Sequence, residues 1–495
     1  MSNNYKPFVF QLPLGSSALL KKDSNDNDLI LSSVISYPLF SLGFHSFLHR
    51  TKNAMEITKN LETKNKFYYV VNPFEHKITD YKDDLGTQTK KFFNMTKEDP
   101  NILSRAFYKM WEMIYYFDLA SKDNLTYAAL AEGPGSFLQA VLKFREKYGY
   151  DLKNDKYFGV TIHPEDGKNI EMGKQFMNYY DKRYPSLLNI HKTNTRAKSN
   201  KLKSISNGDI TEVKTISLFK KEVAKSKKYA DLVTADGGFD WNDENYQEQE
   251  AFQLILGEII GAIRVQNKDG HFVLKVFETF TISSLKMIYI LSSFYNEIYI
   301  CKPLYSRESN SEKYLICKGF KYDQKKDKDS LDNKISKLEN ILEKLSSNDY
   351  LQDIFPDFEL PEEFINKFKY INIEIANKQQ IMINKIVTYI KNNNYFGDKY
   401  HQSREEQIKA TKWWVENFFT DTYNKNNLTN FTAVLGNSVA QGNGDAYLEG
   451  KKNYSITHNL YEANKTNYLI FGRAGHHSIA AVANLIKVYK LTNQS

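Results

Sequence analysis

The chain has 495 residues, more than a single hydrophobic core usually supports, so we expect one large domain with appended segments. Its 41% hydrophobic and 25% charged residues are typical of a folded globular protein and exclude a chain that is disordered throughout. The formal net charge of +8 suits an anionic partner but does not identify one.

The two cysteines, Cys301 and Cys317, are too few for a disulfide framework or a cysteine-rich zinc site, and this predicts a reducing compartment. The first residues lack the basic and apolar regions of a signal peptide, and no run has the apolar length of a membrane span. We therefore expect an intracellular protein of the cytoplasm or nucleus (the host cytoplasm if the chain is viral), with no membrane and no metal as partner.

The order of expected elements begins with residues 1–100, an N-terminal extension of short apolar patches and polar loops. Residues 101–120 are a helix candidate, with apolar side chains at helical spacing. Strand and helix patterns then alternate as far as residue 320. The expected strands span residues 125–135 (including a glycine turn), 156–162, 202–210, 230–236, 270–277, 296–303 and 312–320. The expected helices among them span residues 136–148, 248–266 and 282–295.

This alternation predicts an α/β fold, a Rossmann-like open sheet with helices on both faces. The last two strands are joined by only about ten residues, too few for a helical crossover, so they are expected to form an antiparallel pair at the sheet edge. Open α/β sheets bind their ligands outside the carboxyl ends of the strands, so those ends are where functional residues are expected.

The composition changes after residue 322, and we expect a separate, mainly helical C-terminal domain over 323–495 that could hold protein partners. Residues 325–347 have the pattern of a helix with an apolar stripe. Ser403 and Glu406 have the spacing of a capping box at the start of another helix. The glycine-rich segment 435–446 lacks the Lys-Ser or Lys-Thr of a phosphate-binding loop. The predicted domains are thus 1–100, 101–322 and 323–495.

Three expected strand ends carry glycine or aspartate. In "AEGPGSF" (131–137), the glycines would let a ligand approach the backbone at a helix N-terminus, although such a turn alone is common. Asp209 and Asp236 could bind ribose hydroxyls, an adenine amino group or a ligand ammonium, or could simply cap the helices that follow. Their occurrence together at neighbouring strand ends favours a nucleoside-like ligand.

Lys275 lies inside the apolar run "FVLKVF", where an ammonium must be paired or lose its proton. One interpretation is a structural ion pair with Asp236 or Glu278. The other is a base whose pKa is lowered by burial and by a second cation, Lys109, while Asp236 and Glu312 orient the amine and a substrate hydroxyl.

A basic run at residues 191–204, which contains Lys198 and Lys201 and no acid, could track RNA phosphates or could be a solvated loop. Both interpretations stay open at this stage.

Six motifs resemble a known family in their order and approximate spacing. They are "SRAFYKMWEM", "AEGPGSF", "NGDIT", "TADGGFDW…ENYQE", "GHFVLKVFETFT" and "SRESNSEKYLICKGF". Over roughly residues 100–320 they resemble the FtsJ-like ribose 2′-O-methyltransferases, most of all those specific for the mRNA cap. The resemblance implies an enzyme that uses S-adenosylmethionine and acts on the first transcribed nucleotides of capped mRNA without a metal. Alternatives are a methyltransferase of ribosomal or transfer RNA and an inactive RNA-binding scaffold.

The resemblance also assigns residues. It implies a catalytic tetrad of Lys109, Asp236, Lys275 and Glu312, with Lys275 as general base. The expected cofactor-binding residues are Gly133, Pro134, Gly135, Ser136, Phe137, Asp209, Ile210 and Asp236. The expected RNA contacts are Asn245, Arg307, Lys198 and Lys201. Glu132 and Ser136 depart from the family pattern, in which small residues and a second glycine are common at these two positions.

Overall fold

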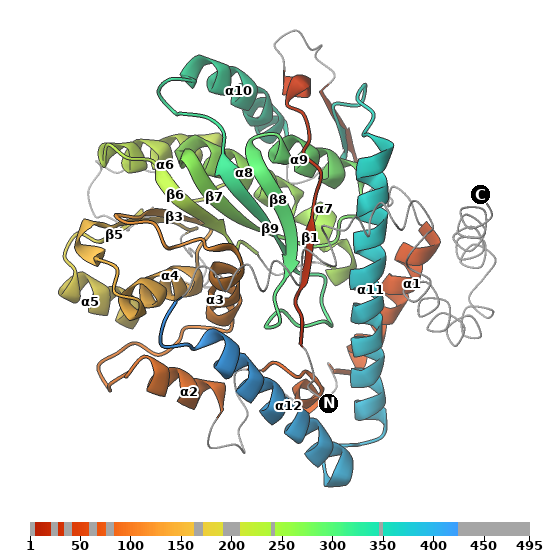
Figure 1. Ribbon diagram of the computed structural model, residues 1–495. Coiled ribbons are helices and arrows are strands. Elements are labelled where there is room, and N and C mark those ends of the chain that lie inside the picture. Colours follow the sequence, from red (N-terminus) through yellow and green to blue (C-terminus); the bar gives the residue numbers. More distant parts are fainter. Residues whose placement is uncertain are drawn as a thin grey trace, which may run out of the picture.

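The computed structural model describes residues 5–20, 28–33, 42–58, 67–75, 84–162, 172–191, 208–238, 243–345 and 350–423. These residues form an eight-stranded sheet in the order β1-β8-β9-β7-β6-β3-β4-β5, with helices on both faces, and a separate two-stranded pair (Figure 1). The predicted α/β architecture is confirmed.

The sheet has a parallel half and an antiparallel half. The parallel strands are β3 (Thr126–Leu130), β4 (Lys156–Val160), β5 (Leu188–His191), β6 (Ala230–Ala235) and β7 (Gln266–Val276). The antiparallel strands are β8 (Tyr295–Lys302), β9 (Lys313–Phe320) and β1 (Phe8–Gln11). The expected antiparallel pairing of β8 with β9 is confirmed, and β1 from the N-terminal extension adds one further strand outside it.

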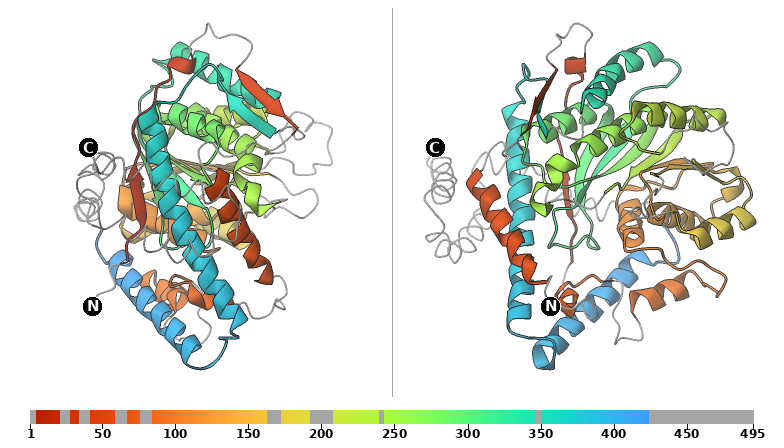
Figure 2. Two further views of the ribbon diagram at one scale, coloured as in Figure 1. Left: turned by 90° about the vertical axis from the view of Figure 1, so that its right-hand side faces the viewer. Right: turned by 180° about the vertical axis from the view of Figure 1, so that it is seen from behind.

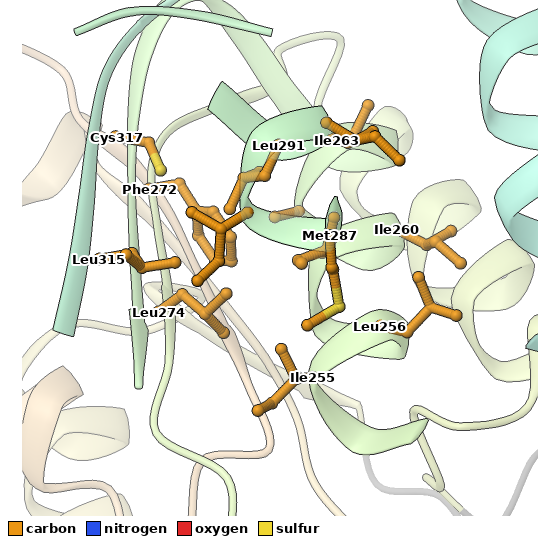
Figure 3. Close-up of a cluster of buried hydrophobic side chains, with 14 of the residues drawn as sticks. Ile255, Leu256, Ile260, Ile263, Phe272, Leu274, Met287, Leu291, Leu315 and Cys317 are labelled. Atoms are coloured by element: carbon orange, nitrogen blue, oxygen red, sulfur yellow. The ribbon is translucent and has the colours of Figure 1, made fainter. Parts of the chain in front are cut away.

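Two buried clusters hold helices against opposite faces of the sheet (Figure 1). One face is covered by α6 (Val213–Lys225), α8 (Phe252–Val265), α9 (Ile282–Ser292) and α10 (Lys328–Lys344). The other is covered by α3 (Ala106–Phe117), α4 (Ser136–Lys147), α5 (Lys174–Arg183) and α12 (Gly397–Phe418). Figure 3 shows the first cluster, where side chains of α8 and α9 pack on Phe272 and Leu274 of β7 and Leu315 of β9. Such close packing of apolar side chains is the main stabilising contribution to the fold.

The outer edge of the sheet is covered. The long helix α11 (Glu362–Lys391) runs beside β1 (Figures 1 and 2), with the rings of Phe10 and Tyr370 5.6 Å apart. Helix α1 (Leu42–Asn53) packs on α11. Covering an edge in this way prevents it from pairing with another chain. The remaining elements are α2 (Leu85–Phe92), α7 (Gln247–Glu250) and the pair β2 (Leu29–Ser32) and β10 (Tyr350–Ile354), with short 3-10 turns at 18–20, 54–58, 67–71, 152–154 and 244–246.

The C-terminal helices pack directly on this core. The stripe expected on α10 is buried in the same cluster as the sheet, and Trp414 of α12 is buried in the other. The three-domain division stays a prediction, since shared clusters do not mark boundaries. The predicted helix start at the capping box was wrong, because α12 begins at Gly397 and Ser403 lies inside the helix. The residues before Ser403 are polar and carry no apolar stripe, so the sequence hid the start of this helix.

Residues 202–207 of the strand expected at 202–210 lie outside the described part. The remaining residues, Gly208–Ile210, form a turn. The strand that pairs with β4 is β5, at Leu188–His191, which the sequence pattern did not reveal because it has only four residues.

Candidate active site

The alternation of side chains along the strands directs one set of polar residues to one face. In β7, Phe272 and Leu274 belong to the cluster under α8 and α9, whereas Val273 belongs to the cluster under α3. Because side chains alternate with a period of two, Lys275 lies on the same face as Val273. The same parity places Asp236, which follows β6, and Glu312, which precedes β9, on the α3 face.

The structure brings the four predicted catalytic residues together as two ion pairs. Lys109 of α3 lies with its ammonium nitrogen 2.6 Å from Glu312 Oε1. Lys275 Nζ lies 3.3 Å from Asp236 Oδ1 and donates a 2.8 Å hydrogen bond to the Asp236 carbonyl. Tyr314 of β9 donates its hydroxyl hydrogen to Asp236 Oδ1 at 3.1 Å. The ion pair of Lys275 with Asp236 is confirmed, while Glu278 pairs instead with Lys52 at 2.8 Å.

Charges within the site set the pKa values of its members. Burial lowers the pKa of Lys275, but the carboxylates of Asp236, Glu312 and Glu258 outweigh it, and the net pKa is raised. Burial raises the pKa of Glu312, but Lys109, Lys275 and Lys302 outweigh it and hold the pKa well below its usual range. We expected burial and Lys109 to lower the pKa of Lys275. This expectation is wrong for the protein without a ligand, because three acids lie near the amine and raise its pKa.

Two further carboxyls lie in the site, and sequence reasoning did not assign either to it. Glu258 of α8 accepts a 3.1 Å hydrogen bond from the Gly237 amide, and burial raises its pKa to about 8. Glu132, directly after β3, accepts from the Phe137 amide at 3.1 Å, and its pKa is also raised to about 8, by burial and then by the charge of Asp236. Its other oxygen, Oε2, is buried without a hydrogen-bond partner among the described residues. At neutral pH both carboxyls thus tend to hold a proton, and this limits the negative charge of the site.

The match to a known family covers this same region. Residues 102–320 match the model of the FtsJ-like methyltransferase family. This part of the chain is an FtsJ-like methyltransferase domain. The chain is 28% identical over 218 residues to the cap-specific mRNA (nucleoside-2′-O-)-methyltransferase 1 of Trypanosoma cruzi, covering 43% of this chain and 52% of that protein.

Two other relatives extend the comparison. The cap-specific mRNA (nucleoside-2′-O-)-methyltransferase 1 of Mus musculus is 31% identical over 243 residues, covering 44% of this chain and 26% of that protein. The inactive cap-specific mRNA (nucleoside-2′-O-)-methyltransferase 1B of Caenorhabditis briggsae is 25% identical over 301 residues, covering 60% and 33%. The chain thus spans about half or less of the length of these curated relatives.

In the methyltransferase domain, the turn after β3 requires glycine at one position, where protein side chains pack closely against the backbone. Gly135 is the N-cap of α4 with φ +105°, a conformation that side chains other than glycine rarely adopt, and a Cβ there would lie 3.1 Å from the Met172 methyl carbon. Gly133 is exposed, and Pro134 is half-buried. Ser136 and Phe137 are instead engaged by protein: Ser136 Oγ lies 2.7 Å from Ser104 Oγ, and the Phe137 ring is buried against Tyr314.

Asp209 and Ile210 lie in the turn before α6. Asp209 Oδ1 accepts from the Thr211 amide at 2.9 Å and from the Thr211 hydroxyl at 2.7 Å. It therefore stabilises a local turn and is not the N-cap of α6, which is Glu212. Ile210 is buried, and its carbonyl closely approaches Gly257 of α8. A contact of either residue with a cofactor stays a prediction.

Two of the four expected RNA contacts, Asn245 and Arg307, lie in the described part of the chain, and each contacts other protein side chains. Asn245 donates its side-chain amide to Asn53 Oδ1 of α1 at 2.7 Å. Arg307 Nε lies 2.5 Å from Glu75 Oε1, and its guanidinium carbon lies 3.8 Å from the Tyr69 ring centroid. Lys198 and Lys201 lie outside the described residues. Their contact with RNA remains a prediction.

Within the described ranges, no group of three or more His, Cys, Asp or Glu side chains is arranged to hold a metal. No helix of the described part is both long and apolar enough to cross a membrane.

Proposed function

We propose that this chain is an S-adenosylmethionine-dependent ribose 2′-O-methyltransferase that acts on the first transcribed nucleotides of capped mRNA. The observation that carries the proposal is the pairing of Lys109 with Glu312 and of Lys275 with Asp236 at the edge of the sheet where β6 and β7 end and β9 begins. Two amines and two acids in one buried site can bind a hydroxyl and accept its proton while the total charge stays near zero.

Lys275 is the group to which we assign the proton of the 2′-hydroxyl. Its ammonium is fixed by the Asp236 carbonyl and carboxylate, and both contacts determine where the amine points. Its raised pKa means that the chain alone keeps it protonated. A cationic ligand nearby would offset Asp236 and Glu312 and lower that pKa, which is the direction a general base requires.

The residues present fit S-adenosylmethionine as that ligand. The cofactor would supply a methyl group on a positively charged sulfur. The exposed Gly133, together with Gly135 at the N-terminus of α4, offers backbone amides for its carboxylate. Glu132 Oε2, which has no hydrogen-bond partner among the described residues, offers an acceptor for its cationic groups. A Cβ at Gly238 would lie 3.3 Å from Lys275 Nζ, so the turn after Asp236 is open because this position is a glycine.

Capped mRNA is proposed as substrate because the curated relatives described above carry that specificity in their names. One of those relatives is named as inactive, so an inactive RNA-binding chain is the alternative to exclude. The intact ion pairs favour activity, since clustered charged groups with specific partners are typical of functional sites.

The test is methyl transfer from labelled S-adenosylmethionine to short RNAs that carry a cap, a triphosphate end or no modification, with ribosomal RNA as a further substrate. We expect transfer to capped RNA, with the label on a ribose 2′-oxygen of the first nucleotides. Lys275→Met should lower the rate by roughly 100- to 10,000-fold.

The control is Lys286→Met, because Lys286 is also a shielded lysine, with 2% of its side chain exposed against 12% for Lys275, and it pairs with Asp353 at 2.9 Å, away from the site. Methyl transfer only to ribosomal RNA would show that ribosomal RNA, and not capped mRNA, is the substrate. If the wild type transfers no methyl group to any of these RNAs, the proposed methyltransferase activity is rejected.

A further inference from the structure

The loop 303–312 between β8 and β9 is held at both ends by one helix. At its start, the amides of Leu304 and Tyr305 donate to the Glu112 carboxylate of α3 at 2.7 and 3.0 Å. At its end, Glu312 pairs with Lys109, which lies one turn before Glu112 on the same helix. The loop therefore delivers Glu312 to the site, and its geometry decides where that carboxylate lies.

Lys302, the last residue of β8, lies under this loop and is 6% exposed. The three hydrogens of its ammonium are shared among four acceptors of the loop, and it donates to none elsewhere among the described residues. They are Ser306 Oγ at 3.2 Å, Asn310 O at 3.0 Å, Asn310 Oδ1 at 2.9 Å and Glu312 O at 2.7 Å. Neither the family match nor the tetrad gives this lysine a role.

The chemistry of the ammonium fixes the direction of the next hydrogen bond. An ammonium only donates, so Ser306 Oγ must accept from Lys302, and its own hydrogen is left for another acceptor. That acceptor is Glu312 Oε1 at 2.8 Å, with the Glu312 carbonyl as a longer alternative at 3.3 Å. The resulting chain runs from Lys302 through the Ser306 hydroxyl to the carboxylate that Lys109 holds on its other side.

We propose that Lys302 is a positioning residue of the methyltransferase site, which orients the Glu312 carboxylate through Ser306 and clamps the loop that carries it. The expected effect of Lys302 on the rate rests on the proposed function. The expected effect of Lys302 on the position of the Glu312 carboxylate does not.

The charge of Lys302 makes this arrangement sensitive to pH. Its pKa is lowered to about 7, mainly by burial and also by the charges of Lys313 of β9 and Lys109 of α3, while Glu312 and Glu308 oppose the shift. A neutral amine can accept a hydrogen bond, so above that pH the Ser306 hydroxyl can turn from Glu312 towards Lys302. The orientation of Glu312 should therefore loosen as pH rises through about 7.

The kinetic test compares Lys302→Met, Lys302→Arg and Ser306→Ala with Lys286→Met as the buried-lysine control. We expect Lys302→Met to lower kcat by roughly 10- to 100-fold, the scale of a misplaced catalytic group, with little change in S-adenosylmethionine affinity measured by calorimetry. The wild-type kcat should change as pH passes about 7. Ser306→Ala should lower kcat less than Lys302→Met does, and its kcat should not show this change near pH 7. Lys302→Arg, which stays charged, should also lack that change and keep more activity than Lys302→Met.

A crystal structure supplies the readout that needs no activity. In Lys302→Met and Ser306→Ala the Glu312 carboxylate should move away from Lys109. An unmoved carboxylate in both variants overturns the proposal, even if the wild type proves to transfer no methyl group. A Lys302→Met variant that folds and has the same kcat as the wild type also overturns the proposal. If the wild-type protein itself transfers no methyl group, the proposed function is rejected, and this is a separate result.

Discussion

Glu312 lies between two lysines of different elements: its Oε1 is 2.6 Å from Lys109 Nζ of α3, and the charge of Lys275 on β7 also lowers its pKa. The pair with Lys109 is almost fully shielded from water, with side-chain exposures of 8% and 13%. A buried pair of this kind constrains both function and stability, because neither charge can be removed alone at low cost.

Removal of the Lys109 charge should therefore destabilise the fold. We expect Lys109→Met to lower the free energy of unfolding by about 3 kcal/mol, measured by chemical denaturation. The double variant with Glu312→Gln should regain part of that loss, since no unpaired charge remains. Lys122→Met, which breaks a pair whose lysine is 57% exposed, is the control and should change stability by less than about 1 kcal/mol. Equal losses for the two lysines would contradict the prediction.

The turn after Asp236 should tolerate no added side chain. Gly238 is exposed, but a Cβ there would lie 3.3 Å from Lys275 Nζ and crowd the amine. We expect Gly238→Ala to lower kcat by about tenfold while unfolding stability changes by less than about 0.5 kcal/mol. Gly86→Ala, whose nearest atom would be 3.6 Å away, serves as the control. An unchanged kcat would contradict the prediction, because it would show that a Cβ at Gly238 does not displace the Lys275 amine.

Glu132 should make stability depend on pH. Its pKa is raised to about 8, so the folded chain binds a proton that the unfolded chain has lost above about pH 4.5. The stability that this group contributes is complete below that pH and is lost as pH rises to about 8.

In Glu132→Gln this loss is absent. The stability of the variant relative to the wild type should thus increase between about pH 5 and pH 8, with a slope of at most about 1.4 kcal/mol per pH unit. Denaturation series at several pH values measure the slope. The control is Glu222→Gln, at a half-buried position of α6 beside Lys225, for which this difference should be flat. A flat difference for Glu132→Gln as well would mean that this carboxyl titrates normally.

Arg307 offers a test of RNA binding that is independent of catalysis. Although paired with Glu75, its side chain is 23% exposed and can still face a phosphate. We expect Arg307→Met to weaken binding of capped RNA and to reduce the slope of log affinity against log salt by about one. Lys228→Met, at an exposed position after α6, is the comparison. An unaltered salt slope for Arg307→Met would remove this residue from the RNA contacts.

The sequence predicted which four charged residues lie together better than it predicted their electrostatics. The motifs around Lys109, Asp236, Lys275 and Glu312 were sufficient to expect them together, and strand parity explains why they meet. The motifs did not indicate that Glu258 would join them, because its contact with Gly237 depends on how α8 lies on the sheet. A lone acid within the apolar run of α8 was the available signal. The direction of the Lys275 pKa shift was missed for another reason: Asp236 and Glu312 were expected beside the amine, but the sequence could not show that their charges outweigh burial.

Long-range contacts also limited the prediction of the fold. Helices with a regular apolar stripe, such as α8 and α10, were expected correctly because their periodicity is local. Strand β1 pairs with β8, with Phe8 opposite Lys302, and nothing in four residues near the N-terminus indicates a partner so distant in the sequence. The start of α12 was missed for a related reason, since its first turn is polar.

The strand β1 also bears on how the protein can be dissected. A fragment cut to the family match at 102–320 would lose both β1 and α11, which together shield the outer side of β8. The bared N–H and C=O groups would then be available to a second fragment, and edge-to-edge association is the usual fate of such a strand. The smallest well-behaved piece of this chain is thus not the contiguous stretch that matches the family.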